Sequence, residues 1–142
     1  MKNCAALLSI SVFILASSMA DYNKPIGVAA VDMQRIINAD REPQNWLAHG
    51  RTYDEQRFSP LTTINADNVS ELGLDWYLDL GTDRGQEATP IVVDGVIYVS
   101  GAWNIVYAID ARSGELLWQH NPETSRVWVA EYAVHDAVSR GL

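Results

Sequence analysis

The stretch GQEATPIVVDGVIYVSGAWNIVYAIDARSGELLW, residues 85–118, decides how this chain folds. Its short apolar runs are separated by turn residues, which is the pattern of β-strands joined by tight turns. We expect four strands, at residues 89–93, 96–100, 105–109 and 115–119. Asp94-Gly95 between the first two strands predicts a type I′ hairpin, because both central residues of that turn need positive φ. The whole stretch therefore predicts an antiparallel meander.

The end of this stretch carries a spaced motif that indicates a repeat. Ala108, Asp110, Gly114 and Trp118 follow the spacing A-x-D-x-x-x-G-x-x-x-W. A Leu stands two residues before both Trp76 and Trp118, and the two tryptophans are separated by the ~40–45 residues of a propeller blade. Gly114 permits a turn, and Ala108 is small enough for a neighbour's tryptophan to lie over it. We therefore predict one blade of a β-propeller, with Trp76 and Trp118 docking between blades.

The composition and the first residues place limits on function and location. The 142 residues carry a formal net charge of −8, which argues against a nucleic-acid partner because such partners require a basic patch. Lys2, an apolar run over residues 5–16 and a small-x-small site at 18–20 predict a cleaved signal peptide over residues 1–20. The run is too short for a transmembrane anchor. Cys4, the only cysteine, precedes the run and is not a lipid-anchor site.

The remainder divides into an N-terminal arm with a connector, residues 21–72, and an incomplete propeller, residues 73–142. In the arm, apolar residues near helical spacing predict a short helix over residues 29–39. Asn65 is expected to cap a helical turn through Leu72. Residues 74–80 alternate between apolar and polar, and they predict an extended β-segment around Trp76.

Four blocks of the sequence carry a resemblance to a known family. They are NWLAHGRTYDEQRFSPL at 45–61, INADNVSELGLDW at 64–76, RGQEATPIVVDGVIYV at 84–99 and AIDARSGELLW at 108–118. The last block is common among tryptophan-motif propellers, whereas the first three together are far more specific. The chain resembles the N-terminal portion of a quinoprotein or quinohemoprotein alcohol dehydrogenase that depends on pyrroloquinoline quinone (PQQ).

The resemblance implies an all-β fold and a redox function. We expect a fragment of an eight-bladed tryptophan-motif β-propeller, consisting of about one complete four-stranded blade and the N-terminal arm. Members hold PQQ in the central channel beside Ca²⁺ or a lanthanide, oxidise a small alcohol by hydride transfer to PQQ, and pass electrons to a cytochrome c. Some carry a further haem c domain. The implied location is the periplasm.

The resemblance also assigns cofactor-binding residues. Glu87 in RGQEATP matches the family glutamate that contacts PQQ, and Arg140 in DAVSRGL matches the arginine that pairs with a PQQ carboxylate. A planar guanidinium grips a carboxylate with two hydrogen bonds. Glu87 then needs a donor of its own, which Arg140 or a ring N–H of PQQ could supply. Without the resemblance, both residues would be interpreted as ordinary solvated side chains.

The chain departs from the family at Val134 and His135, where many members have two adjacent cysteines that form a disulfide against PQQ. His135 could stack on the quinone in their place. The catalytic aspartate and the metal ligands are expected beyond Leu142, so we assign no catalytic or metal residue and expect this chain to be inactive alone. Two alternatives remain: a non-catalytic binding propeller of the outer-membrane assembly type, and a decayed gene remnant.

Overall fold

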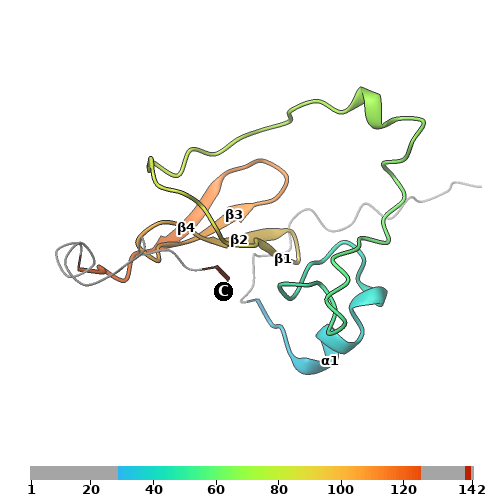
Figure 1. Ribbon diagram of the computed structural model, residues 1–142, viewed down its shortest axis with the longest axis horizontal. Coiled ribbons are helices and arrows are strands. Elements are labelled where there is room, and N and C mark those ends of the chain that lie inside the picture. The colour runs from blue at the N-terminus through green and yellow to red at the C-terminus, as the bar shows by residue number, and fades with distance from the viewer. Residues whose placement is uncertain (1–28, 126–139, 142) are drawn as a thin grey trace, which may run out of the picture.

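A computed structural model of the chain describes residues 29–125, 140 and 141 (Figure 1). The elements are α1 (Met33–Ile37), the 3₁₀ helices Ala39–Arg41 and Val69–Glu71, and strands β1 (Ile91–Val93), β2 (Val96–Ser100), β3 (Val106–Asp110) and β4 (Leu116–His120). The four strands form one antiparallel sheet in the order β1-β2-β3-β4, which confirms the predicted meander. The predicted signal peptide lies outside the described residues.

The turns of the sheet follow the local sequence. Asp94 and Gly95 have φ of 50° and 85°, as the predicted type I′ hairpin requires. Trp103 and Asn104 also have positive φ, of 61° and 58°, and they make the turn between β2 and β3. Ile105 was expected in the third strand, but its N–H closes this turn on the Ala102 carbonyl at 3.3 Å, so β3 begins one residue later.

The arm is less helical than its spacing predicts. The expected helix over residues 29–39 is shortened to α1, because Asp32 caps its start by accepting a hydrogen bond from the Arg35 N–H at 2.8 Å. Its end is set by Asn38, whose side-chain amide donates to the Gln34 carbonyl at 2.7 Å. The chain then tightens into the 3₁₀ helix Ala39–Arg41, well before Pro43.

The connector after the arm has one short helical turn. The 3₁₀ helix Val69–Glu71 lies where a helical turn was expected. Asn65 accepts a hydrogen bond from the Asp67 N–H at 2.9 Å, and its backbone carbonyl accepts from the Val69 N–H at 2.9 Å. Asn65 therefore begins the turn, while Asn68 directly precedes the 3₁₀ helix.

The predicted β-segment at residues 74–80 is wrong as a strand within the described part of the chain. The segment pairs with none of the four strands there, and it runs as an irregular path above the sheet (Figure 1). Leu74 and Tyr77 are 81% and 80% exposed. Alternation marks which side chains share a face, but a strand exists only where a neighbouring backbone supplies hydrogen bonds.

Trp76 is the exception in this segment, because it docks on the turn between β3 and β4. Its indole Nε1 donates to the Ala111 carbonyl at 3.3 Å. A Cβ built on Gly114 would lie 2.5 Å from the Trp76 ring, so the ring packs directly on the glycine backbone. Gly114 also has φ of 73°, a conformation that side chains other than glycine's disfavour. Trp76 thus packs against this motif in the described sheet, and its docking between blades stays a prediction.

The other motif residues form a row across the sheet. Ala108 pairs with Tyr98 on one side and with Trp118 on the other, and it is fully buried. The rings of Tyr98 and Trp118 meet over it with centroids 5.9 Å apart. The small residue therefore accommodates aromatic rings of its own sheet. Trp118 remains 46% exposed, and its docking on a neighbouring blade stays a prediction.

The arm is joined to the β1–β2 hairpin by a polar cluster. Arg35 forms ion pairs with Glu42 and with Asp94, the latter at 2.8 Å. Asn45 donates to Glu42 and accepts from the Asp94 N–H at 2.9 Å. Hydrogen bonds from Arg35 and Asn45 hold the pKa of Glu42 below its ordinary value. Beside this cluster, Trp46 pairs with Val92 through two backbone hydrogen bonds of 2.9 Å.

Replacing Gly114 by alanine should destabilise the protein more than the same change at Gly95. Both glycines have positive φ, which costs alanine roughly 1 kcal/mol. Only Gly114 has a ring against it, whereas nothing lies within 4 Å of a Cβ on Gly95. We expect Gly114→Ala to lower the free energy of unfolding by about 1–3 kcal/mol beyond Gly95→Ala, as measured by urea denaturation. Equal losses of unfolding free energy in the two variants would mean that the Trp76 contact contributes nothing to stability.

The Glu42 cluster predicts a pH dependence of stability. The pKa of Glu42 is lower in the folded state than its ordinary value of 4.5. The stabilisation that ionised Glu42 gives to the folded state is therefore complete above pH 4.5, and it is lost as the pH falls through the lower, folded-state pKa. Glu42→Gln should reduce the free energy of unfolding at pH 7 by about 1–2 kcal/mol and flatten its decline below pH ~4.5. Glu71→Gln, at an exposed position, is the control, and an equal effect there would contradict the prediction.

Candidate functional site

Glu87 and Arg140 meet at the end of the sheet opposite the β1–β2 hairpin. Glu87 lies in the loop that leads into β1, and Arg140 lies far along the chain. The Arg140 Nε and the Glu87 Oε2 are 3.0 Å apart. The Arg140 carbonyl also accepts a hydrogen bond from the Thr89 N–H at 3.3 Å, which holds its backbone beside the start of β1. Two residues that the sequence analysis singled out are thus in direct contact.

The ion pair is open to solvent. The side chains of Arg140 and Glu87 are 84% and 48% exposed. The pair uses only Nε of the guanidinium, and the two terminal nitrogens of Arg140 have no hydrogen-bond partner among the described residues. Within the described residues, the edge formed by the two terminal nitrogens is therefore not engaged, and such an edge can bind a carboxylate through paired hydrogen bonds. Glu87 meanwhile fixes the orientation of the planar group.

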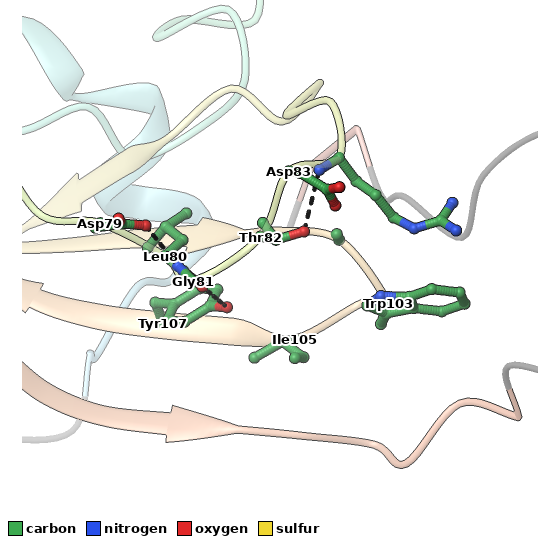
Figure 2. Close-up of a pocket in the computed structure, with 10 residues that line it drawn as sticks. Asp79, Leu80, Gly81, Thr82, Asp83, Trp103, Ile105 and Tyr107 are labelled. Carbon is green, nitrogen blue, oxygen red and sulfur yellow. Dashed lines mark hydrogen bonds between the residues drawn. The ribbon is translucent and has the colours of Figure 1, made fainter.

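A pocket of about 660 Å³ lies beside this loop, between residues 79–84 and residues 102–107 (Figure 2). The Tyr107 hydroxyl donates to the Leu80 carbonyl at 3.3 Å, and burial raises the Tyr107 pKa. The guanidinium of Arg84 stacks on Trp103, 4.4 Å from the ring centroid. These contacts hold the loop on the β2–β3 turn just before it reaches Glu87.

The remaining sequence-predicted site residues lie elsewhere. Val134 and His135 fall outside the described residues, so the stacking role of His135 stays a prediction. In the part of the chain that the structure describes, no three His, Cys, Asp or Glu side chains gather as metal ligands would. Within the same residues, no helix has the length and apolar character needed to cross a membrane.

The residues that hold the loop were not predicted from the sequence. Tyr107 belongs to an ordinary apolar strand pattern, and its hydroxyl contact crosses 27 residues of sequence. A Trp at a turn position, as in GAWN at residues 101–104, was the one available signal of an unusual local structure. Trp103 has a positive φ of 61°, which is uncommon for a bulky side chain.

The fold and the docked tryptophan define the class of protein. Four antiparallel strands in sequence order, with Trp76 seated on the glycine of the A-x-D-x-x-x-G-x-x-x-W motif, are one blade of a β-propeller. The family model described as PQQ glucose/ethanol/alcohol dehydrogenase, β-propeller domain, matches residues 46–142. The chain belongs to this family.

Curated relatives give the same assignment. Quinohemoprotein alcohol dehydrogenase ADH-IIG of Pseudomonas putida is 55% identical over 114 residues, covering 80% of this chain and 16% of the relative. The dehydrogenase subunit of the quinone alcohol dehydrogenase of Komagataeibacter europaeus is 46% identical over 138 residues, covering 97% of this chain and 18% of the relative. The chain thus spans less than a fifth of the length of these relatives.

Solved structures agree on the fold. The structure of ADHIIG from Pseudomonas putida HK5 matches with a TM-score of 0.75 at 56% identity, over 79% of this chain and 16% of that one. A europium-containing methanol dehydrogenase matches with a TM-score of 0.67 at 38% identity, over 77% of this chain and 19% of that one. The predicted all-β propeller fold and the predicted family are confirmed.

The residues present fit the cofactor that this family implies. PQQ carries three carboxylates, and the Arg140 guanidinium offers two terminal nitrogens with no partner in the described part of the chain. The ion pair with Glu87 also balances the carboxylate that would otherwise repel an anionic ligand. The donor set therefore suits a planar, carboxylate-bearing molecule.

The exposed Glu87–Arg140 pair should contribute little to folding. A single hydrogen bond between largely solvated charges gains little over water. We expect Glu87→Gln to change the free energy of unfolding by less than about 0.5 kcal/mol in urea denaturation. Glu42→Gln, which breaks a less exposed cluster, should cost clearly more. A loss at Glu87 as large as the loss at Glu42 would show that the pair is structural.

Proposed function

We propose that this chain forms the N-terminal, PQQ-contacting part of a periplasmic quinoprotein that oxidises alcohols. The observation that carries the proposal is the Glu87–Arg140 pair, which leaves a guanidinium edge free in the described structure at the end of the sheet where the loop enters β1. Family membership over residues 46–142 supplies the chemical setting, because the family takes its name from PQQ and its dehydrogenases.

The proposed roles follow from the chemistry of the two side chains. Bound PQQ supplies the quinone that accepts a hydride from the alcohol. Arg140 binds a PQQ carboxylate through its terminal nitrogens, as guanidinium groups do in paired hydrogen bonds. Glu87 holds Nε of Arg140 and so orients the guanidinium plane. For His135, which lies outside the described residues, we propose stacking on the quinone in place of the paired cysteines of many members.

The other partners are proposed from the relatives. The names "quinohemoprotein" and "1-butanol dehydrogenase (cytochrome c)" support a small-alcohol substrate, a cytochrome c electron acceptor and a haem c domain in the whole protein. The europium in the neighbouring structure supports a bound metal ion, for which we propose Ca²⁺ or a lanthanide beside PQQ. A signal peptide over residues 1–20 would direct export of the protein, and the proposed location is the periplasm.

Two alternatives to an enzyme can be distinguished from it. The match to the dehydrogenase family supports an enzyme over an outer-membrane assembly propeller, which would lack the blocks at 45–61 and 84–99. A gene remnant is distinguished by sequencing the gene beyond codon 142. Further tryptophan-motif blades there would support the enzyme, and a stop with no blades after it would support the remnant.

Substitution of Arg140 should weaken PQQ binding by the apoprotein of the natural full-length gene product. We expect Arg140→Ala to raise the dissociation constant about 10- to 100-fold, because hydrogen bonds to charged groups contribute about 1.5–3 kcal/mol each. Arg140→Lys should recover only part of the affinity, since an ammonium lacks the paired donors. The measurement is a titration followed by quenching of tryptophan fluorescence.

Arg41→Ala is the matched control. Arg41 is exposed on the 3₁₀ helix Ala39–Arg41, and its substitution also removes one positive charge. Its dissociation constant should equal that of the unmodified protein. Equal affinities for Arg140→Ala and Arg41→Ala would refute the proposed cofactor role of Arg140.

A further inference from the structure

The buried end of β2 touches both chain segments that form the Glu87–Arg140 pair. Ser100 is the last residue of β2 and is 2% exposed. Its hydroxyl donates to the carbonyl of Gly141 at 3.5 Å, directly after Arg140. Gly101 follows and contacts the other segment through Gln86, directly before Glu87. Ser100 and Gly101 therefore contact Gly141 and Gln86, the residues next to Arg140 and Glu87 in the sequence.

Gly101 acts by lacking a side chain. A Cβ built at this position would lie 2.9 Å from Oε1 of Gln86 and 2.9 Å from Cε2 of Tyr107. Both distances are too short for a real Cβ, so an added methyl group must displace one of these side chains. Tyr107 is buried and its hydroxyl holds the Leu80 carbonyl, which leaves Gln86 as the group that moves more easily. The displaced atom is Oε1, at the end of the exposed Gln86 side chain, and Gln86 directly precedes Glu87 in the sequence.

Ser100 acts through a hydrogen bond. In the described part of the chain, the Thr89 N–H donates to the Arg140 carbonyl, and the Ser100 hydroxyl donates to the next carbonyl, that of Gly141. The long side chain of Arg140 is 84% exposed, so its direction depends on where the backbone is fixed. Loss of the Ser100 hydroxyl removes one of these two backbone contacts.

We infer that Ser100 and Gly101 are positioning residues for PQQ binding: Ser100 places Arg140 through Gly141, and Gly101 places Glu87 through the space left for Gln86. The inference rests on the proposed cofactor role of the Glu87–Arg140 pair. Neither residue touches the ligand in this account. Each sets the place of a group that does, and small displacements of binding groups weaken a site strongly.

The test is a set of double-mutant cycles on the apoprotein of the natural full-length gene product, titrated with PQQ by tryptophan fluorescence. Ser100→Ala should raise the dissociation constant about 2- to 10-fold, the range of one hydrogen bond. Gly101→Ala should raise it by a comparable factor, because the end of the Gln86 side chain must move. Gly85→Ala is the control, because a Cβ there meets nothing within 4 Å and the backbone has no positive φ.

The cycles separate positioning from general stability. If Ser100 acts through Arg140, the effect of Ser100→Ala should disappear in an Arg140→Ala background, and the effect of Gly101→Ala should shrink in a Glu87→Ala background. Ser100→Ala removes a single oxygen atom, so its apoprotein is expected to keep its melting temperature. This variant decides the inference even if Gly101→Ala fails to fold.

The outcomes are distinguishable. The inference is overturned if Ser100→Ala binds PQQ as tightly as Gly85→Ala does, even though Arg140→Ala binds it more weakly. An undiminished Ser100→Ala effect in the Arg140→Ala background also overturns it, because the hydroxyl would then act independently of Arg140. Unchanged binding by Arg140→Ala overturns the proposed function, and the inference falls with it.

Discussion

The contact between the Trp76 ring and the Gly114 backbone is the constraint on which the rest of the structure depends. A large aromatic ring can lie flat on a backbone only where the residue below has no Cβ. The contact ties the segment that precedes the sheet to the turn between its last two strands. The chain between Trp76 and β1 must then cross to the other edge of the sheet (Figure 1). Glu87 belongs to this stretch of the sequence.

The two ends of β1 use charge in different ways. At the hairpin end, Arg35, Glu42 and Asp94 form a partly enclosed cluster that joins the arm to the sheet. At the other end, Glu87 and Arg140 form one exposed ion pair with a single hydrogen bond. Enclosed, multiply bonded charges stabilise a fold more than solvated ones. The first arrangement suits structure, and the second suits binding of a ligand that brings its own charges.

Local sequence signals predicted the strands and turns well, because turn chemistry is decided by a few adjacent residues. Asp94-Gly95 needs only its own positive φ values to form the hairpin. The segment at 74–80 shows the limit, since its alternation is real but a strand requires a partner backbone. The helix over 29–39 was overestimated because the cap at Asp32 and the turn at Asn38 were not weighed against the spacing.

The candidate site was predictable only through the resemblance. Nothing in the local pattern of Glu87 or Arg140 separates them from solvated surface residues, and their contact joins positions 53 residues apart. Ser100 and Gly101 gave no signal at all, because a small residue at a strand end is ordinary. The proposed positioning role of Ser100 and Gly101 depends on which chain segments the fold brings into contact with them.

The most direct measurement is an experimental structure of the natural full-length gene product with PQQ bound. The account predicts that the terminal nitrogens of Arg140 lie within hydrogen-bond distance of a PQQ carboxylate, with Glu87 still bonded to Nε. PQQ bound at another place, with the Glu87–Arg140 pair facing bulk water, would contradict it.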